Sequence, residues 1–215
     1  MDQTQPHLVY FADPMCSWCW GFVPVMALIR RRFGDALPIR VVMGGLRPGT
    51  EKPMTEAAKA DTRGHWEHVQ EASGQPFDWR FFEREGFVYD TDPAARAVVL
   101  ARRQDAVLAL ALLVRIQGAF YAQNQDVTQP AVLAALAGEL GFDAAEFEAL
   151  LADEGLKRET WGDYAVSQRA GVTGFPTLVA GPNPDGTYGL VTRGFNVAEL
   201  VVPAVEQWFE GARAA

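Results

Sequence analysis

Short apolar runs at the start of the chain predict two strands with a helix between them. Residues 7–12 read HLVYFA and residues 39–43 read IRVVM, and turn-forming residues follow each run, as is typical of buried strands. From residue 17 to residue 33, apolar side chains recur at three-to-four spacing, which favours one helix that Gly34 ends. This order predicts a βαβ unit whose two strands run parallel.

A second pair of strands is predicted near the end of the chain. Residues 176–180 read PTLVA and residues 188–192 read YGLVT, and the segment between them is rich in Gly and Pro. Two short strands joined by such a turn predict an antiparallel hairpin. A closing helix is expected to begin at the cap Asn196, and Pro203 is expected to kink or interrupt it.

The segment between these ends is predicted to be almost entirely helical. Residues 51–169 contain Ala- and Leu-rich runs with helical period, and we expect them to form an all-helical insertion. Residues 1–50 and 170–215 would then form one discontinuous α/β domain. An order of βαβ and then ββα is the layout of the thioredoxin fold. The candidate helix caps are Asp92-Pro93, Thr128 and Asp143, the last with Glu146 at capping-box spacing.

Charge and hydropathy exclude two classes of partner. The 215 residues include 19 basic and 27 acidic ones, a net charge of −8, and an acidic surface repels nucleic-acid phosphates. The basic runs at residues 30–32 and 102–103 are interpreted as solvated helix ends. The best candidate for a membrane span, residues 107–116, is shorter than the roughly 18 residues required. The first residues lack the basic start and apolar run of a secretory signal, so we expect a cytoplasmic protein.

Only two cysteines occur, three positions apart in Cys16-Ser17-Trp18-Cys19, between the first predicted strand and the helix. On a helix this spacing puts both sulfurs on one face, about one turn apart, so they can close a small disulfide ring. Cys16 would face the N-terminal end of the helix dipole, which favours the reactive thiolate, and Cys19 would lie a turn deeper. The pair predicts thiol–disulfide exchange, in which Cys16 attacks a substrate disulfide and Cys19 resolves the mixed disulfide.

Two other uses of the cysteine pair are open. A CxxC pair is half of a zinc site, but zinc takes about four ligands. The only further candidates in the chain are three histidines, His7, His65 and His68. The gap from Cys19 to His65 and His68 is much longer than in a zinc finger. Two idle cysteines in a helix core are the other alternative. The strand–CxxC–helix context favours redox use, so no metal is expected.

A second chemical signal lies in residues 171–178, which read GVTGFPTL. Pro176 opens a predicted core strand, although a proline cannot donate to a strand ladder. A cis Phe175–Pro176 bond, which bends the chain tightly into the strand, explains this position better than an ordinary trans proline.

Together these motifs resemble a known family. Strand–CxxC–helix, a central helical insertion and Gly-Val-x-Gly-x-Pro-Thr before a hairpin are similar to the DsbA-like branch of the thioredoxin superfamily. Within that branch, residues 13–22, DPMCSWCWGF, look closest to the cytoplasmic FrnE-like proteins assigned as protein-disulfide isomerases. The resemblance covers nearly the whole chain and implies a DsbA-like thioredoxin fold.

The resemblance also implies roles for individual residues. Cys16 matches the nucleophile, Cys19 matches the resolving thiol, and Pro176 matches the cis-proline that faces them. Phe175 would offer its backbone to an extended substrate strand, a form of β-augmentation. The substrates implied are protein or peptide thiols and disulfides.

The dipeptide between the cysteines, Ser17-Trp18, tunes the redox potential in this family. Strongly oxidising DsbA proteins carry His there, and this chain does not. The resemblance therefore implies a less oxidising couple, which suits reduction or isomerisation in the cytoplasm. No cofactor is implied beyond the redox-active Cys16–Cys19 disulfide itself, with glutathione as a candidate co-substrate.

Several other side chains are candidates for the surroundings of the pair. Arg47, after the second strand, is a candidate for binding an acidic group such as a glutathione carboxylate; a solvated or ion-paired arginine is the alternative. Trp18 is a candidate cover for the disulfide, whereas Trp20 and Phe22 are interpreted as core. Further candidates to line the cleft are His65, Trp66 and His68.

Three functions are compatible with these residues. The main hypothesis is a protein-disulfide reductase or isomerase. The second is a glutathione-dependent isomerase or transferase of the same superfamily; such relatives often carry Ser at the nucleophile position, so the presence of both Cys16 and Cys19 argues against it. The third is a non-catalytic protein-binding adaptor, which would tolerate serine at both positions. The sequence does not predict the client or the oligomeric state.

Overall fold

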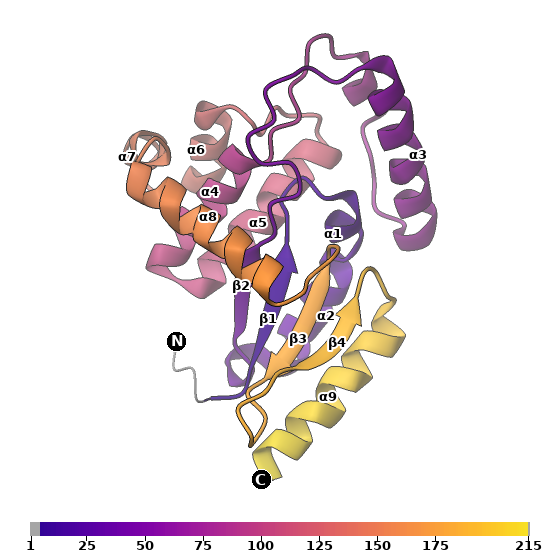
Figure 1. Cartoon of the computed structure of the whole chain (residues 1–215), viewed down its shortest axis with the longest axis vertical. Helices are drawn as coiled ribbons and strands as arrows, with labels where there is room; N and C mark the ends of the chain where they lie inside the picture. Colours follow the sequence, from indigo (N-terminus) through magenta and orange to yellow (C-terminus); the bar gives the residue numbers. More distant parts are fainter. Residues whose placement is uncertain (1–4, 215) are drawn as a thin grey trace.

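A four-stranded mixed sheet is the centre of the computed structural model, which describes residues 5–214 (Figure 1). The strands are ordered β2-β1-β3-β4. They are β1 (His7–Ala12), β2 (Ile39–Met43), β3 (Thr177–Gly181) and β4 (Gly189–Arg193). β1 pairs with β2 in parallel, and β3 is antiparallel to both β1 and β4. The predicted βαβ unit and hairpin are confirmed, with β3 and β4 each beginning one residue later than expected.

The segment of residues 17–33 forms two helices, α1 (Ser17–Gly21) and α2 (Val23–Phe33), so the expectation of one continuous helix is wrong. Phe22 lies between them, and its N–H still bonds back into α1. Pro24 lies in the first turn of α2 and has no N–H with which to continue the ladder of helical bonds. The proline therefore begins a new helix, which separates the short cysteine-bearing helix from the rest.

The chain between β2 and β3 is mostly helical, as predicted. Ala and Leu are the most frequent residues of the helix at residues 106–121, so the mean hydropathy of this helix is high. The helices of this segment are α3 (Glu56–Ser73), α4 (Asp92–Gln104), α5 (Ala106–Tyr121), α6 (Pro130–Gly138), α7 (Ala144–Leu151) and α8 (Glu154–Arg169), with a 3₁₀ turn at Trp79–Glu83.

The predicted helix caps hold at one position and fail at two. Asp143 caps α7 and accepts a hydrogen bond from the backbone N–H of Glu146, as expected. The residue before α4 is Thr91, and Asp92 is already the first residue of that helix. The residue before α6 is Gln129 rather than Thr128. Asp92 is instead held by long-range partners, which a local sequence pattern does not reveal.

The last helix, α9 (Ala198–Ala214), begins two residues after Asn196 and runs through Pro203, so the predicted interruption is wrong. A proline inside a helix removes one backbone hydrogen bond. The apolar face of α9 offsets this loss by packing into the main core, through Val201, Val205 and Phe209.

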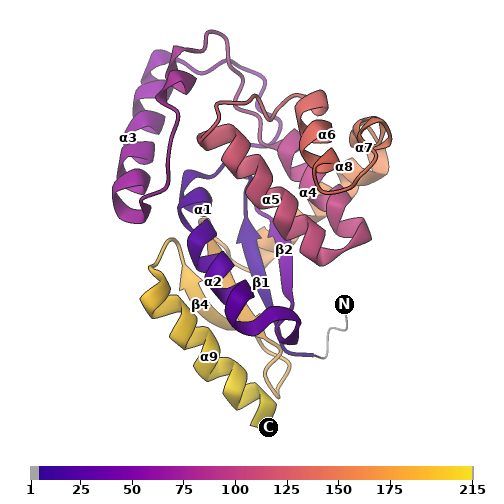
Figure 2. The same cartoon turned by 180° about the vertical axis from the view of Figure 1, so that it is seen from behind.

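The two faces of the sheet are covered unequally. Leu8 and Tyr10 of β1 belong to the main hydrophobic core, on the side where α2 and α9 lie (Figure 2). Val9 and Phe11 alternate to the other face and form a small separate cluster with Val42 of β2. On that face α8 lies across β2 and β1, while β3 and β4 carry no helix (Figure 1).

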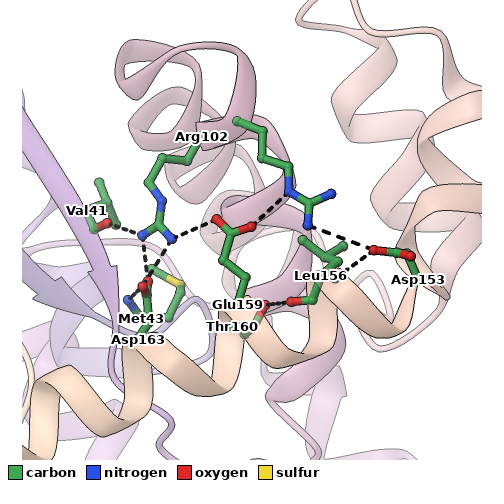
Figure 3. A network of polar contacts seen from close by, with 9 residues as sticks. Val41, Met43, Arg102, Asp153, Leu156, Glu159, Thr160 and Asp163 are labelled. Atoms are coloured by element: carbon green, nitrogen blue, oxygen red, sulfur yellow. Dashed lines mark hydrogen bonds and ion pairs between the residues drawn. The ribbon is translucent and has the colours of Figure 1, made fainter. Parts of the chain in front are cut away.

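The outer edge of β2 is hydrogen-bonded by side chains from two helices (Figure 3). Arg102 of α4 donates to the carbonyl of Val41 at 2.9 Å, and Asp163 of α8 accepts from the N–H of Met43 at 2.9 Å. Arg102 and Asp163 also pair directly, at 2.6 Å. These side chains take the place of a neighbouring strand and fix the helical segment to the sheet.

The interpretation of residues 102–103 as a solvated helix end is therefore wrong for Arg102, whereas Arg103 is exposed in the last turn of α4, as predicted. The Arg102 side chain is largely buried, and Arg103 contacts Glu159 at 2.9 Å and Asp153 at 3.9 Å. In contrast, residues 30–32 lie in the last turn of α2, as predicted. Across the part of the chain that the structure describes, no helix is long and apolar enough to cross a membrane.

Replacing Asp163 with Ala would leave the Met43 N–H and the largely buried Arg102 guanidinium without their shared partner. We expect the free energy of unfolding in urea to fall by about 3 kcal/mol. Glu139→Gln, which breaks an exposed ion pair with Arg115, serves as the control and is expected to leave stability unchanged. Equal stability of the two variants would contradict the role assigned to Asp163.

Candidate functional site

Cys16 lies at the N-cap of α1, one turn after the end of β1. Its backbone is extended, and its carbonyl accepts the N–H of Trp20 at 3.1 Å. Its side chain is 6% exposed, and its thiol donates to the carbonyl oxygen of Phe175 with an S···O distance of 3.6 Å. Cys19 is fully buried, and both thiols are free. The structure thus brings the two cysteines and Phe175 together across the chain.

The buried thiol of Cys19 is held in its neutral form. Burial raises its pKa well above the ordinary value; the hydrogen bond and charge of Cys16 raise it further, while a hydrogen bond from the Asp13 backbone opposes them. Burial also raises the pKa of the neighbouring Tyr10, followed in effect by the charges of Cys19 and Cys16. Because the thiolate is the reactive form, Cys19 needs a proton acceptor before it can attack.

The loop with Phe175 and Pro176, which faces Cys16, packs on the backbone of a glycine that follows β2. The Phe175–Pro176 peptide bond is cis, as the strand-opening proline predicts. The ring of Phe175 packs on Gly44, where an added Cβ would come within 2.1 Å of the ring. Gly45 has a φ of 72° and packs in the same way against the ring of Tyr164. The bare position at Gly44 lets the Phe175 ring lie directly on this backbone, which helps to hold the Phe175 carbonyl beside Cys16.

A fully buried carboxylate, Asp13, connects the ends of β1 and β2. Its Oδ1 accepts the N–H of Met15 at 2.9 Å, and its Oδ2 accepts the N–H of Leu46 at 2.8 Å. Burial raises its pKa from 3.8 to about 6, although these two hydrogen bonds and one from Thr91 lower it. Asp13 therefore fixes the turn that carries Cys16 and is a proton acceptor near neutral pH.

Aromatic side chains support this turn from the helical side. The Tyr89 hydroxyl donates to the carbonyl of Met15 at 2.8 Å and lies 3.5 Å from the hydroxyl of Tyr121. Tyr121 stacks on Trp20 with ring centroids 6.2 Å apart. These rings continue into a buried aromatic cluster that packs around Trp66.

The aromatic residues beside the cysteines divide as expected. Trp20 and Phe22 are buried in the core. Trp18 is half-buried and packs on Phe195 at a centroid distance of 5.5 Å, and Ser17 beside it is also half-buried. The dipeptide between the cysteines is thus accessible from outside.

The positively charged side chain of Arg47 lies over the ring of Tyr89. Its guanidinium lies 4.7 Å from the centre of the Tyr89 ring, and its backbone N–H donates to the Thr91 hydroxyl at 3.1 Å. Within residues 5–214, no acidic side chain forms an ion pair with Arg47. Because Tyr89 also binds Met15, this cation lies close to the cysteine turn.

The histidines are not gathered around the cysteines. His65 and His68 are exposed on α3, and His7 lies on β1, where its ring bonds to the Tyr188 hydroxyl at 3.0 Å. No group of three His, Cys, Asp or Glu side chains in residues 5–214 is placed to hold a metal ion, so the zinc alternative gains no support. Trp66 is fully buried and does not line a cleft.

Sequence reasoning missed Asp13 and Tyr89 as parts of the site. The available signal for Asp13 is an acidic residue that directly follows a fully apolar strand and precedes Cys16 by three positions. Tyr89 reaches the turn from the helical segment, so no local pattern identifies it.

The match to known proteins covers most of the chain. Residues 7–191 match the family described as the DSBA-like thioredoxin domain. Among solved structures, a protein from Nitrosomonas europaea assigned as a protein disulfide isomerase is 34% identical, with a TM-score of 0.88 over 96% of this chain and 98% of that one. The cytosolic disulfide reductase DsbM from Pseudomonas aeruginosa is 26% identical, with a TM-score of 0.76 over 97% of this chain and 100% of that one. DsbM has also been solved with GSH.

Curated relatives with a different description also match. The ClpXP adapter protein SpxH from Halalkalibacterium halodurans is 23% identical over 182 residues, which are 82% of this chain and 59% of that protein. SpxH from Bacillus subtilis is 24% identical over 169 residues, which are 78% of this chain and 56% of that protein. This chain thus spans less than two thirds of the length of these adapters.

The raised pKa of Asp13 predicts a specific dependence of stability on pH. The folded chain binds this proton more tightly than the unfolded chain, so the stabilisation is complete below about pH 4 and is lost as the pH rises through about 6. The loss amounts to about 3 kcal/mol. In Asp13→Asn we expect it to be absent, which urea unfolding at a series of pH values measures.

The asparagine variant loses one of the two backbone hydrogen bonds, because its amide nitrogen cannot accept. Its stability is therefore expected to be lower at pH 4, and only the change with pH tests the assignment. Curves that run parallel for wild type and variant between pH 4 and pH 7 would show that another group titrates.

Proposed function

Since the chain belongs to the DSBA-like thioredoxin family, we propose that it is a thiol–disulfide oxidoreductase that reduces or isomerises protein and peptide disulfides through Cys16 and Cys19. The observation that carries the proposal is the position of Cys16, at the start of α1 with its thiol 3.6 Å from the Phe175 carbonyl of the proline loop. Cys19 lies buried one turn further along. Because Cys16 is more accessible than Cys19, we assign attack to Cys16 and resolution to Cys19.

In the proposed reaction, the Cys16 thiolate attacks one sulfur of a substrate disulfide. A bond forms between Cys16 and that sulfur, and the other substrate sulfur leaves as a thiolate. Cys19 then attacks the Cys16 sulfur, which closes the Cys16–Cys19 disulfide and releases the second substrate thiol. Two thiol equivalents from a donor such as glutathione return the pair to the dithiol.

The resolving step needs removal of the Cys19 proton, because burial keeps that thiol neutral. The negative charge of Asp13 is one of the causes that raise the pKa of Cys19, and Asp13 itself has a pKa of about 6, so it is largely ionised at pH 7. We assign the proton of Cys19 to Asp13 in this step. Tyr10, whose pKa is raised well above 10, stays protonated beside the pair.

The substrate would align along the proline loop. Phe175 offers its backbone to an extended peptide, and Pro176 fixes the bend behind it. Ser17 and Trp18 lie between the cysteines and are accessible to the same peptide. The Ser17-Trp18 dipeptide supports reduction or isomerisation over oxidation. The cytosolic description of DsbM, at 26% identity, supports a cytoplasmic location.

Glutathione is the proposed small thiol partner. The structure of DsbM with GSH, at 25% identity, supports this choice. Arg47 is a candidate to bind one of the glutathione carboxylates, because its guanidinium lies over Tyr89 and lacks an acidic partner in the described chain. A glutathione-dependent isomerase or transferase is the alternative enzyme, and the presence of both cysteines argues against it.

A protein-binding adaptor is the second candidate function. The similarity to the SpxH adapters favours it. In that case partner binding would not need the thiols, and replacing both cysteines with serine would leave it intact. The two functions are therefore separated by the cysteine variants that follow.

Reduction of insulin by dithiothreitol, followed by turbidity, tests the oxidoreductase. Wild type is expected to accelerate precipitation, and Cys16→Ser is expected to abolish the acceleration. Cys19→Ser is expected to retain attack but to accumulate a mixed disulfide with the substrate, which mass spectrometry of the intact protein detects. An inert wild type whose cysteines still form the internal disulfide would favour the adaptor.

The role of Arg47 is tested with two small disulfides. Glutathione disulfide carries carboxylates, whereas cystamine carries none. In Arg47→Gln we expect KM for glutathione disulfide to rise about fivefold with little change in kcat, because an exposed charge pair contributes up to about 1 kcal/mol. KM for cystamine is expected to stay the same. An equal rise for both disulfides would mean that the substitution disturbs the turn rather than a carboxylate site.

A further inference from the structure

One face of the sheet is only partly covered, and its open part is apolar. Val9, Phe11 and Val42 form the small cluster on this face, with Val179 of β3 packed against it. Next to them, Leu190 on β4 is 56% exposed. A large exposed apolar side chain beside a partly covered apolar cluster is typical of a surface that binds a partner.

These residues line a groove with a volume of 480 Å³. Its floor is the sheet itself. One wall is formed by the end of α8 and the segment after it, through Val166 and Val172, and the other by β4 and the turn before it, through Leu190 and Tyr188. We call this feature the sheet groove.

The charge on the rim of the sheet groove is opposite to that of the chain. Arg40 and Arg193 line it, and no acidic residue does. Within residues 5–214, neither guanidinium forms an ion pair or a side-chain hydrogen bond. Two unpaired arginines beside an apolar floor, on a chain with a net charge of −8, form a local site for negative charge.

The spacing of the two arginines defines the size of the ligand. Arg40 pairs with Val9, and Arg193 pairs with Thr177, so they lie on the two outer strands and two residues apart along the sheet. Strand spacing and rise put their backbones about 16 Å apart. One small carboxylate cannot reach both, whereas an extended peptide spans that distance with about five residues.

We propose that the sheet groove binds an acidic, apolar peptide segment of a partner protein. Its apolar side chains enter the groove over Val9, Phe11 and Val179, and two carboxylates, about five residues apart, pair with Arg40 and Arg193. The cysteine pair belongs to the core on the other side of the sheet, so this site stands independently of the proposed redox function.

Selection from a cysteine-free library of seven-residue peptides displayed on phage tests the proposal. The absence of cysteine prevents capture by Cys16. We expect enriched peptides with acidic residues on both sides of apolar ones. A synthetic fluorescent copy of the strongest peptide is then measured by anisotropy, beside copies with Gln at the acidic positions and with Ser at the apolar ones.

Three variants locate the binding site on the protein. Leu190→Asp places a charge on the apolar wall and is expected to weaken binding at least tenfold. Arg40→Gln and Arg193→Gln are each expected to weaken it about fivefold, less so at high salt. Leu200→Asp is the matched control, because Leu200 is 63% exposed on α9, which lies on the other face of the sheet.

The outcomes are distinct. Selective loss in Leu190→Asp and the two arginine variants, with normal binding by Leu200→Asp, supports the proposal. It is overturned if no peptide is enriched, if the enriched peptides lack acidic residues, or if Leu200→Asp loses affinity to the same degree. Insulin reduction should be the same in all four variants, so failure of the redox proposal and failure of this one can be told apart.

Discussion

The Asp13 carboxylate is the interaction on which the arrangement of the site depends. It lies where two parallel strands end, and each of its oxygens accepts a backbone N–H from a different loop. One loop carries Cys16, and the other leads from Gly44 to Arg47. Because a carboxylate accepts two bonds in fixed directions, it sets the distance between these loops. Its burial raises its own pKa to about 6, so the group that orders the turn also changes its charge near neutral pH.

The helical segment carries neither cysteine. It contributes to the site by fixing the position of the loops around the cysteines. Arg102 and Asp163 attach α4 and α8 to the outer edge of β2, directly before the loop that Asp13 binds. Tyr89, from the connection before α4, supports the cysteine turn from the same side. A helical segment that is remote in sequence therefore fixes both loops, and the two cysteines lie on the short helix α1 beside them.

The sequence predicts those parts of the fold and of the site that local residue patterns determine. The apolar runs locate the four strands to within one residue, and the motif around Cys16 and the proline at 176 mark the two loops that meet. The errors have long-range causes. Asp92 does not cap α4 because its carboxylate binds the side chains of Trp161 and Tyr164. Arg102 is largely buried because it donates to Asp163 and to the Val41 carbonyl. Pro24 is the exception: its missing N–H was a local signal for the division between α1 and α2.

The side chains on the outer edge of β2 also limit how molecules of this protein can join. A sheet with two open edges can add strands on both sides and extend without end. Here the backbone groups at Val41 and Met43 are already occupied, which leaves β4 as the edge available to another strand. Pairing through a single edge closes after two molecules, because each partner then presents only its blocked side. Misassembly of folded chains through the sheet would therefore stop at dimers instead of growing into fibres.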